Sequence, residues 1–190
     1  MKIKFKAACI ISPIFIVSSI LLNGCATLSP AECQTANWDR IGEQDGVLGK
    51  QSQIAQHYKA CTKVNILPNQ QLYESGYQKG LKSYCQATLI YNEALIGKGS
   101  YRVCPSSQHA QLMPFYNTAN QFYEAKKKRD AFYKELDRYQ DYLLDTELSK
   151  EKRDSYIKKI KELKREQDRI DRDYDHADRD RRRFERERRL

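Results

Sequence analysis

The second half of the chain carries a mirrored pattern of apolar residues, and this pattern most limits how the chain can fold. Between residues 156 and 184, seam residues recur at alternating steps of four and three, which is the heptad spacing of a coiled coil. Between residues 115 and 143 the same steps recur in the reverse direction. Two such seams predict an antiparallel helical hairpin that folds back between Ser149 and Lys150, with Ser149 as the cap of the returning helix.

The mirrored seams also predict the register of the hairpin. The expected facing pairs are Leu143 with Tyr156, Leu136 with Leu163, and Phe115 with Phe184. Arg129, Gln167 and Arg181 interrupt the seam, so we expect residues 178–190 to fray. One continuous helix, or a parallel dimer of such helices, would use the same heptads and remains an alternative.

The N-terminus resembles a bacterial lipoprotein signal. Lysines at positions 2, 4 and 6 precede an apolar run over residues 7–22, and Leu-Asn-Gly-Cys at residues 22–25 resembles the lipobox at which such signals are cleaved and acylated. The run is shorter than the ~20 apolar residues of a spanning helix. We expect residues 1–24 to be the signal peptide and residues 25–30 a tether lipidated at Cys25; an uncleaved signal anchor is the alternative.

This resemblance implies a location. Ala26 after the lipidated cysteine implies attachment to the bacterial outer membrane on its periplasmic face. The net charge of +9 at pH 7 would suggest a nucleic-acid partner, but export removes nucleic acid from reach. The expected partners are the membrane, through the lipid at Cys25, and an envelope protein or the cell wall, through residues 109–190.

Four cysteines remain once Cys9 leaves with the signal and Cys25 is lipidated. An even number in an oxidising compartment predicts two disulfides among Cys33, Cys61, Cys85 and Cys104. A capping box at Ser29 begins a helix that we expect to run past Trp38 to about Asp45. A second helix, expected over residues 51–64, would return antiparallel to it. Of the three possible connectivities, this arrangement favours Cys33 with Cys61 and Cys85 with Cys104.

Glycines recur inside the helices expected in this region. A third helix after Asn69 holds Gly76 and Gly80, and each helical glycine costs about 1 kcal/mol relative to alanine. Close approach of two helices, or a capping turn, would account for them. The alternative is a backbone-lined groove for a ligand or partner, and the residues we expect to line it are Trp38, Asp45, Tyr73 and Tyr77.

The spacing of these residues resembles a known family. The set comprises Cys33, Trp38, Gly42, Asp45, Gly46, Gly49, Cys61, Tyr73, Gly76, Gly80, Leu81, Tyr84, Cys85, Gly97, Gly99, Tyr101, Cys104 and Pro105. It is similar to domain-of-unknown-function family 2799. The resemblance implies a small bacterial envelope lipoprotein and supplies no biochemical activity.

No residue pattern in the chain predicts catalysis. His57 and Cys61 are four apart, as a metal pair could be, but Cys61 is expected in a disulfide, so we predict no metal, no cofactor and no enzyme. The expected fold is all-α, with a disulfide-stapled helical domain over residues 31–108 and a coiled-coil hairpin over 109–190. The expected function is that of a non-enzymatic envelope adaptor or structural protein. The alternative is a ligand-binding or enzymatic domain formed by the glycine-containing helices.

Overall fold

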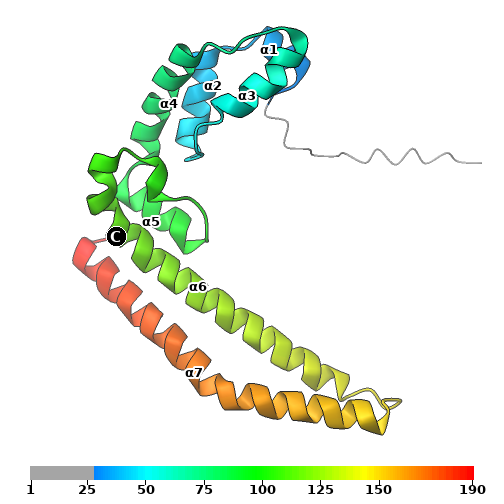
Figure 1. The fold of residues 1–190 in the computed structure, drawn as a ribbon. Helices are drawn as coiled ribbons and strands as arrows, with labels where there is room; N and C mark the ends of the chain where they lie inside the picture. The colour runs from blue at the N-terminus through cyan, green and yellow to red at the C-terminus, as the bar shows by residue number, and fades with distance from the viewer. Residues whose placement is uncertain (1–27) are drawn as a thin grey trace, which may run out of the picture.

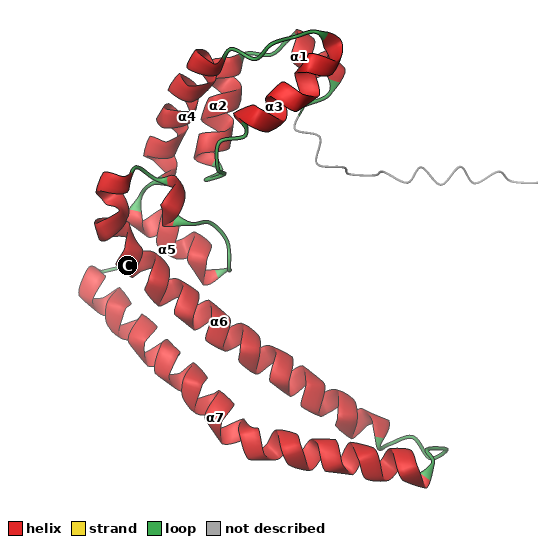
Figure 2. Cartoon of the chain, viewed as in Figure 1, coloured by secondary structure: helices red, strands yellow, loops and turns green. Residues whose placement is uncertain are grey.

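The computed structural model describes residues 28–190, and every regular element in that range is a helix (Figures 1 and 2). In chain order the elements are α1 (Pro30–Gln34), α2 (Trp38–Val47), α3 (Ile54–Cys61), η1 (Thr62–Val64), α4 (Gln70–Tyr84), α5 (Ala87–Leu95), η2 (Tyr101–Val103), α6 (Ser106–Tyr142) and α7 (Lys150–Arg188). The all-α class is therefore confirmed. None of these helices is long and apolar enough to cross a membrane. The expected signal peptide and Cys25 lie outside the described residues.

The first predicted helix is in fact two helices. The capping box forms, with the Ser29 amide donating to a Glu32 carboxylate oxygen at 2.7 Å. However, α1 ends at Gln34, and the Asn37 side chain accepts the Arg40 amide at 3.1 Å to begin α2. The prediction of one helix from Ser29 to about Asp45 was wrong, because asparagine is a strong N-cap and a second helix can start there.

Both disulfides pair as predicted. Cys33 bonds to Cys61 and Cys85 bonds to Cys104, with Cα atoms 5.4 and 5.8 Å apart. Closing loops of these lengths contributes about 3 to 4 kcal/mol each in the chain-entropy model. The first pairing arises from packing between α1 and α3, whereas α2 packs along α4, so the expected hairpin of the first two helices is absent from the described structure.

A helix that the sequence analysis did not anticipate, α5, connects the N-terminal helices to the hairpin. Ala94 on α5 and Ala119 on α6 are both fully buried, and Tyr91 lies in the same cluster. The larger core cluster joins residues of α2 and α4, among them Trp38 and Tyr73, to Ile90 on α5 and Leu112 on α6. As a result α6 runs without a break through the expected domain boundary at residue 109, and its first turns belong to the packed base of the hairpin.

The antiparallel hairpin is confirmed, and so is most of its register (Figure 1). The rings of Phe115 and Phe184 are 5.1 Å apart in an edge-to-face contact. Leu136 and Leu163 share one buried cluster. Near the turn the Tyr156 ring packs at a tilt against those of Tyr139 and Tyr142, with centroids 5.6 and 5.2 Å away, contacts that the predicted pairing with Leu143 did not include. The Ser149 side chain caps α7 as predicted.

The end of α7 does not fray, so that prediction was wrong. The helix continues to Arg188, and Phe184 packs between Phe115 and the Tyr91 ring. Tyr91 donates a hydrogen bond to Glu185 at 2.9 Å. These contacts with α5 and α6 hold the end of α7 in place, although the heptad seam there is weak.

The two arginines that interrupt the seam are also accommodated. The Arg129 guanidinium lies 4.3 Å from the centre of the Tyr174 ring, and its Nε donates to Asp171 at 3.1 Å. The Arg181 guanidinium lies 4.7 Å from the centre of the Phe122 ring. A guanidinium over an aromatic face buries its alkyl stem and keeps its hydrogen bonds, so arginine can occupy a seam position.

Candidate functional site

The glycines of α2 and α4 bring the two helices into direct backbone contact. A Cβ built on Gly42 would lie 2.0 Å from the Tyr73 carbonyl oxygen, and one built on Gly76 would lie 1.8 Å from that of Asp39. Gly80 meets the Glu43 carbonyl in the same way. The contacts advance together along both helices, which therefore run parallel (Figure 1). The prediction that the glycines allow close helix approach is confirmed. The backbone of the facing helix fills the space that a ligand groove along the glycines would need.

Close contact of these helices gathers the four residues that the sequence analysis named. Trp38, Asp45, Tyr73 and Tyr77 are all buried. Tyr73 donates a hydrogen bond from its hydroxyl to Asp45 Oδ2 at 3.0 Å, and the rings of Tyr73 and Tyr77 stack at 6.1 Å. The Tyr73 hydroxyl accepts the Gln53 amide at 2.8 Å. These side chains therefore form a buried cluster and do not line an open groove along the glycines.

The cluster contains one residue whose part in it the sequence did not reveal, His57. Its Nε2 lies 3.1 Å from Asp45 Oδ2, and its ring packs against the rings of Trp38 and Tyr73 at 6.1 and 5.5 Å. An ionised carboxylate only accepts hydrogen bonds, so the Nε2 atom carries the proton in this pair. Twelve residues separate Asp45 from His57 across a loop, and no sequence periodicity connects them.

The environment of Asp45 keeps its carboxyl ionised. Burial on its own would raise the pKa of Asp45, but hydrogen bonds from His57 and Tyr73 and the positive charge of Lys50 outweigh it, so this pKa lies below its ordinary value. The Lys50 ammonium is 3.4 Å from Oδ1. Burial, together with the negative charge of Asp45, raises the pKa of Tyr73 well above its usual range, so its hydroxyl remains a proton donor.

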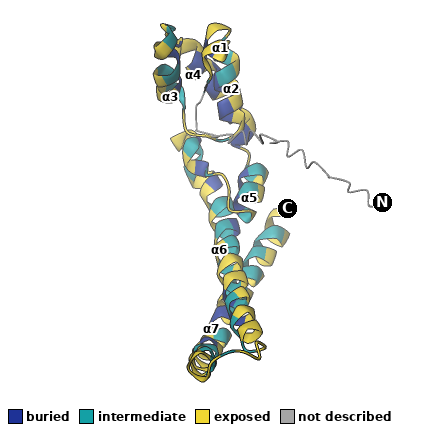
Figure 3. Ribbon diagram, turned by 90° about the vertical axis from the view of Figure 1, so that its right-hand side faces the viewer, coloured by how far each residue is buried: buried dark blue, intermediate teal, exposed yellow. Residues whose placement is uncertain are grey.

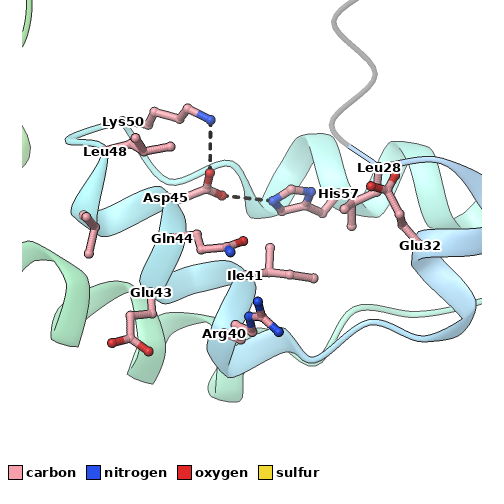
Figure 4. A pocket seen from close by; sticks show the side chains of 11 residues that line it. Leu28, Glu32, Arg40, Ile41, Glu43, Gln44, Asp45, Leu48, Lys50 and His57 are labelled. Carbon is pink, nitrogen blue, oxygen red and sulfur yellow. Dashed lines mark hydrogen bonds and ion pairs between the residues drawn. The ribbon is translucent and has the colours of Figure 1, made fainter.

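A surface cleft of about 720 Å³ lies beside this cluster. Figure 4 shows that Asp45 and His57, both buried, lie between Lys50 on one side of its lining and Leu28 and Glu32 on the other. The rest of its lining comes from α2 and the loop after it: Arg40, Ile41, Glu43, Gln44, Val47 and Leu48. The cleft lies on a different side of α2 from the glycine contact, and it has both charged and apolar walls.

One buried polar atom in the cleft wall has no partner in the described structure. His57 is 3% exposed, and its Nδ1 atom makes no hydrogen bond. Buried polar atoms in folded proteins nearly always have a partner, and an orphan one requires an explanation such as a bound molecule. The ring is oriented by Asp45, which is how a carboxylate positions a histidine that acts through its other nitrogen.

Cys61 is fully buried in its disulfide with Cys33, so its sulfur is not free to pair with His57 at a metal ion. Within residues 28–190 no group of three or more histidine, cysteine, aspartate or glutamate side chains is placed to hold a metal ion. Cys25, the predicted lipidation site, falls outside the described residues, so its role stays a prediction.

The fold and the site define an all-α protein with two disulfides, a glycine-contact helix pair and a coiled-coil hairpin. Residues 37–121 match a family model described as "Protein of unknown function (DUF2799)". This part of the chain belongs to that family, as the sequence analysis predicted. The match covers the Asp45 cluster, α5 and the first turns of α6, and it ends before the distal part of α6. No curated protein and no solved structure matches the chain.

Proposed function

We propose that this protein is a non-enzymatic adaptor of the bacterial envelope, attached to the outer membrane by a lipid on Cys25 and acting through its helical hairpin. Support for the attachment comes from the lipobox at residues 22–25 and the signal-like segment before it. The two disulfides support export, because such bonds persist in oxidising compartments. Helix α1 begins at Pro30, so a short tether would hold the folded part close to the bilayer.

The observation that carries the proposal is the size and exposure of the hairpin. Helix α6 has 37 residues and α7 has 39. At 1.5 Å per residue each reaches about 55 Å. Few residues of these two helices are buried, and Figure 3 shows exposed and intermediate residues along most of their length. Only the base of the hairpin packs against α5. The folding of the N-terminal helices therefore does not explain why the hairpin extends beyond its base. A long exposed arm on a membrane-attached domain suits docking of a distant partner.

A register-preserving truncation tests this proposal. Removing residues 124–137 and residues 162–175 deletes two heptads from each arm and keeps the turn and the base. The arm would become about 21 Å shorter at 1.5 Å per residue. We expect the shortened protein to lose its specific crosslinked partner in the envelope, detected by in-cell crosslinking and mass spectrometry.

The matched control keeps the arm length. In that control the same segments are replaced by heptads with the native seam residues and new exposed residues. Loss of the partner in the shortened chain and retention in the control would indicate that reach matters. If the shortened chain kept the same partner at the native yield, the hairpin would not be the docking element.

A second candidate function is ligand binding in the cleft beside Asp45 and His57. The specific observation in its favour is the unpartnered Nδ1 atom of His57 in the cleft wall. The test is extraction of small molecules from the native protein and from His57→Gln, followed by mass spectrometry. A compound recovered in about equimolar amount from the native protein and absent from the variant would support ligand binding. The same compounds in equal amounts from both proteins would rule out ligand binding through His57.

A further inference from the structure

The cleft beside Asp45 and His57 lies where the described chain begins. Leu28, the first described residue, belongs to the cleft lining and comes three positions after Cys25. Three residues span at most about 11 Å. With the lipid of the proposed function on Cys25, the cleft is therefore within reach of the lipid headgroups. A component of the bilayer is then the ligand with the highest local concentration at the cleft.

One border of the cleft is apolar and open to solvent. Val47 and Leu48, at the end of α2, are 45% and 62% exposed and belong to the lining. Ile41, which is partly buried, adds a third apolar side chain to it. Exposed apolar groups with polar neighbours are typical of surfaces that contact a membrane or an amphiphilic ligand. An acyl chain would cover this border and leave the polar part of the cleft to a headgroup.

The buried polar group of the cleft is a hydrogen-bond acceptor. Since Nε2 of His57 donates its proton to Asp45, Nδ1 carries a lone pair. Figure 4 shows this nitrogen directed away from Asp45, toward Leu28 and Glu32. It makes no hydrogen bond in the described part of the chain. Leu28 precedes α1 and is partly exposed, so a ligand can reach Nδ1 by displacing one side chain. That ligand must supply an N–H or O–H donor.

The charges of the lining favour a ligand with a positive and a negative group. Three carboxylates, of Glu32, Glu43 and Asp45, outnumber the two basic side chains of Arg40 and Lys50, which favours a cationic donor at the buried nitrogen. Lys50 is already paired with Asp45. Arg40 is exposed and makes no ion pair within residues 28–190. A guanidinium binds phosphate through two parallel hydrogen bonds, so an amine with a phosphate matches the lining.

We propose that the cleft binds the headgroup of a membrane phospholipid that carries a primary ammonium, as phosphatidylethanolamine does. The ammonium donates a hydrogen bond to Nδ1 of His57, the phosphate lies against Arg40, and the acyl chains cover Val47 and Leu48. This inference rests on the proposed attachment at Cys25, and it gives the second candidate function a ligand class. Binding of the headgroup holds the N-terminal helices against the bilayer in one orientation.

Native mass spectrometry of the full protein, purified from membranes in a mild detergent, tests the proposal. The probes are phosphatidylethanolamine and phosphatidylcholine with identical acyl chains, supplied as an equimolar mixture. Both headgroups have the same charges, but the choline nitrogen is fully methylated and cannot donate a hydrogen bond. We expect at least tenfold more of the ethanolamine adduct, because the choline lipid would leave the buried acceptor unpaired. Glycerophosphoethanolamine, which has the same headgroup without acyl chains, should bind at least tenfold more weakly.

Substitutions of exposed residues supply the second arm of the experiment. Leu48→Ser and Arg40→Gln should each lower the ethanolamine adduct at least fivefold. Their matched controls, Leu67→Ser and Lys82→Gln, change exposed residues that do not line the cleft and should leave the adduct unchanged. Thermal melts by circular dichroism show that each variant is folded.

Three outcomes would overturn the headgroup proposal: equal adducts of the two lipids, binding of glycerophosphoethanolamine as tight as that of the lipid, or an adduct unchanged in both cleft variants. The same spectra report the mass of the chain itself. Acyl groups on Cys25 without a preference for the ethanolamine lipid would refute the headgroup proposal and leave the attachment in place. An unmodified Cys25 would refute the attachment and, with it, the headgroup proposal.

Discussion

Replacing Gly76 with alanine tests the packing on which the N-terminal helices depend. The new Cβ would lie 1.8 Å from the Asp39 carbonyl oxygen and 2.7 Å from its carbonyl carbon. Ordinary van der Waals contact begins at 3.4 Å, so the distance from this Cβ to the oxygen is too short by about 1.6 Å. Both obstructing atoms are backbone atoms of α2, so no side chain can rotate away. The two helices must move apart, which would also loosen the contacts of Gly42 and Gly80.

The expected magnitude follows from two opposing effects. Overpacking typically costs about 1–3 kcal/mol, and more when the surroundings cannot adjust. Alanine gains about 1 kcal/mol over glycine in helix propensity. Because the obstacle is backbone, we expect a net loss of roughly 2–3 kcal/mol in the free energy of unfolding. At 2–4 °C per kcal/mol for a chain of this length, the melting temperature should fall by about 5–10 °C.

Urea and thermal unfolding of the oxidised protein measure this change. The matched control is Ser75→Ala, one position earlier on the exposed side of α4, which should not lower stability. Adding Gly42→Ala should cost less than its own single effect, because the first substitution already separates the helices. If Gly76→Ala were neutral or stabilising, the direct backbone contact between α2 and α4 would be refuted.

Three further predictions concern the disulfides, the hairpin base and the buried carboxylate. Replacing Cys85 and Cys104 together by alanine should lower the free energy of unfolding by about 3 kcal/mol, measured in urea; a change near zero would contradict the loop-closure argument. Phe184→Ala should lower the free energy of unfolding by roughly 2 kcal/mol, about half the value for a fully buried phenylalanine. It should also speed amide hydrogen exchange over the last turns of α7, whereas the control Arg186→Ala should not. Equal exchange in both variants would mean that α7 is not held at its end. Because folding lowers the pKa of Asp45, the stability that this carboxylate contributes is complete above the ordinary carboxyl pKa near 4 and is lost as the pH falls through the lower pKa of the folded state. Asp45→Asn should therefore flatten the acid dependence of stability in unfolding experiments. An unchanged pH profile would argue against a stabilising role of the ionised Asp45.

The hairpin could be predicted from sequence because its information is local and repeated. Each heptad adds one seam residue, and the mirrored series specifies both the antiparallel direction and the facing pairs. The pairing of Phe115 with Phe184 follows from that pattern. The seam pattern does not show, however, what lies against the hairpin base. The contact of Phe184 with Tyr91 on α5 therefore could not be foreseen, and the end of α7 was predicted to fray.

The candidate site was predictable in part. Glycines at four-residue spacing indicated close helix packing, and the residues around them indicated which side chains would gather. The pairing of Asp45 with His57 could not be predicted, because it crosses a loop and depends on the turn from α2 into α3. The break at Asn37 was missed because capping by one asparagine competes with continuation of the helix, and the pattern favours neither.

In the proposed function, Cys25 attaches the folded chain to a membrane, and the hairpin docks a partner away from the attachment site. The most direct test is the intact mass of the protein purified from the membrane fraction, with Cys25→Ser and a lipoprotein signal peptidase inhibitor as comparisons. We predict a chain that starts at Cys25 and carries fatty acyl groups, with both treatments changing the mass and the membrane fractionation. An unmodified chain that starts at Met1, unaffected by either treatment, would contradict lipid attachment at Cys25.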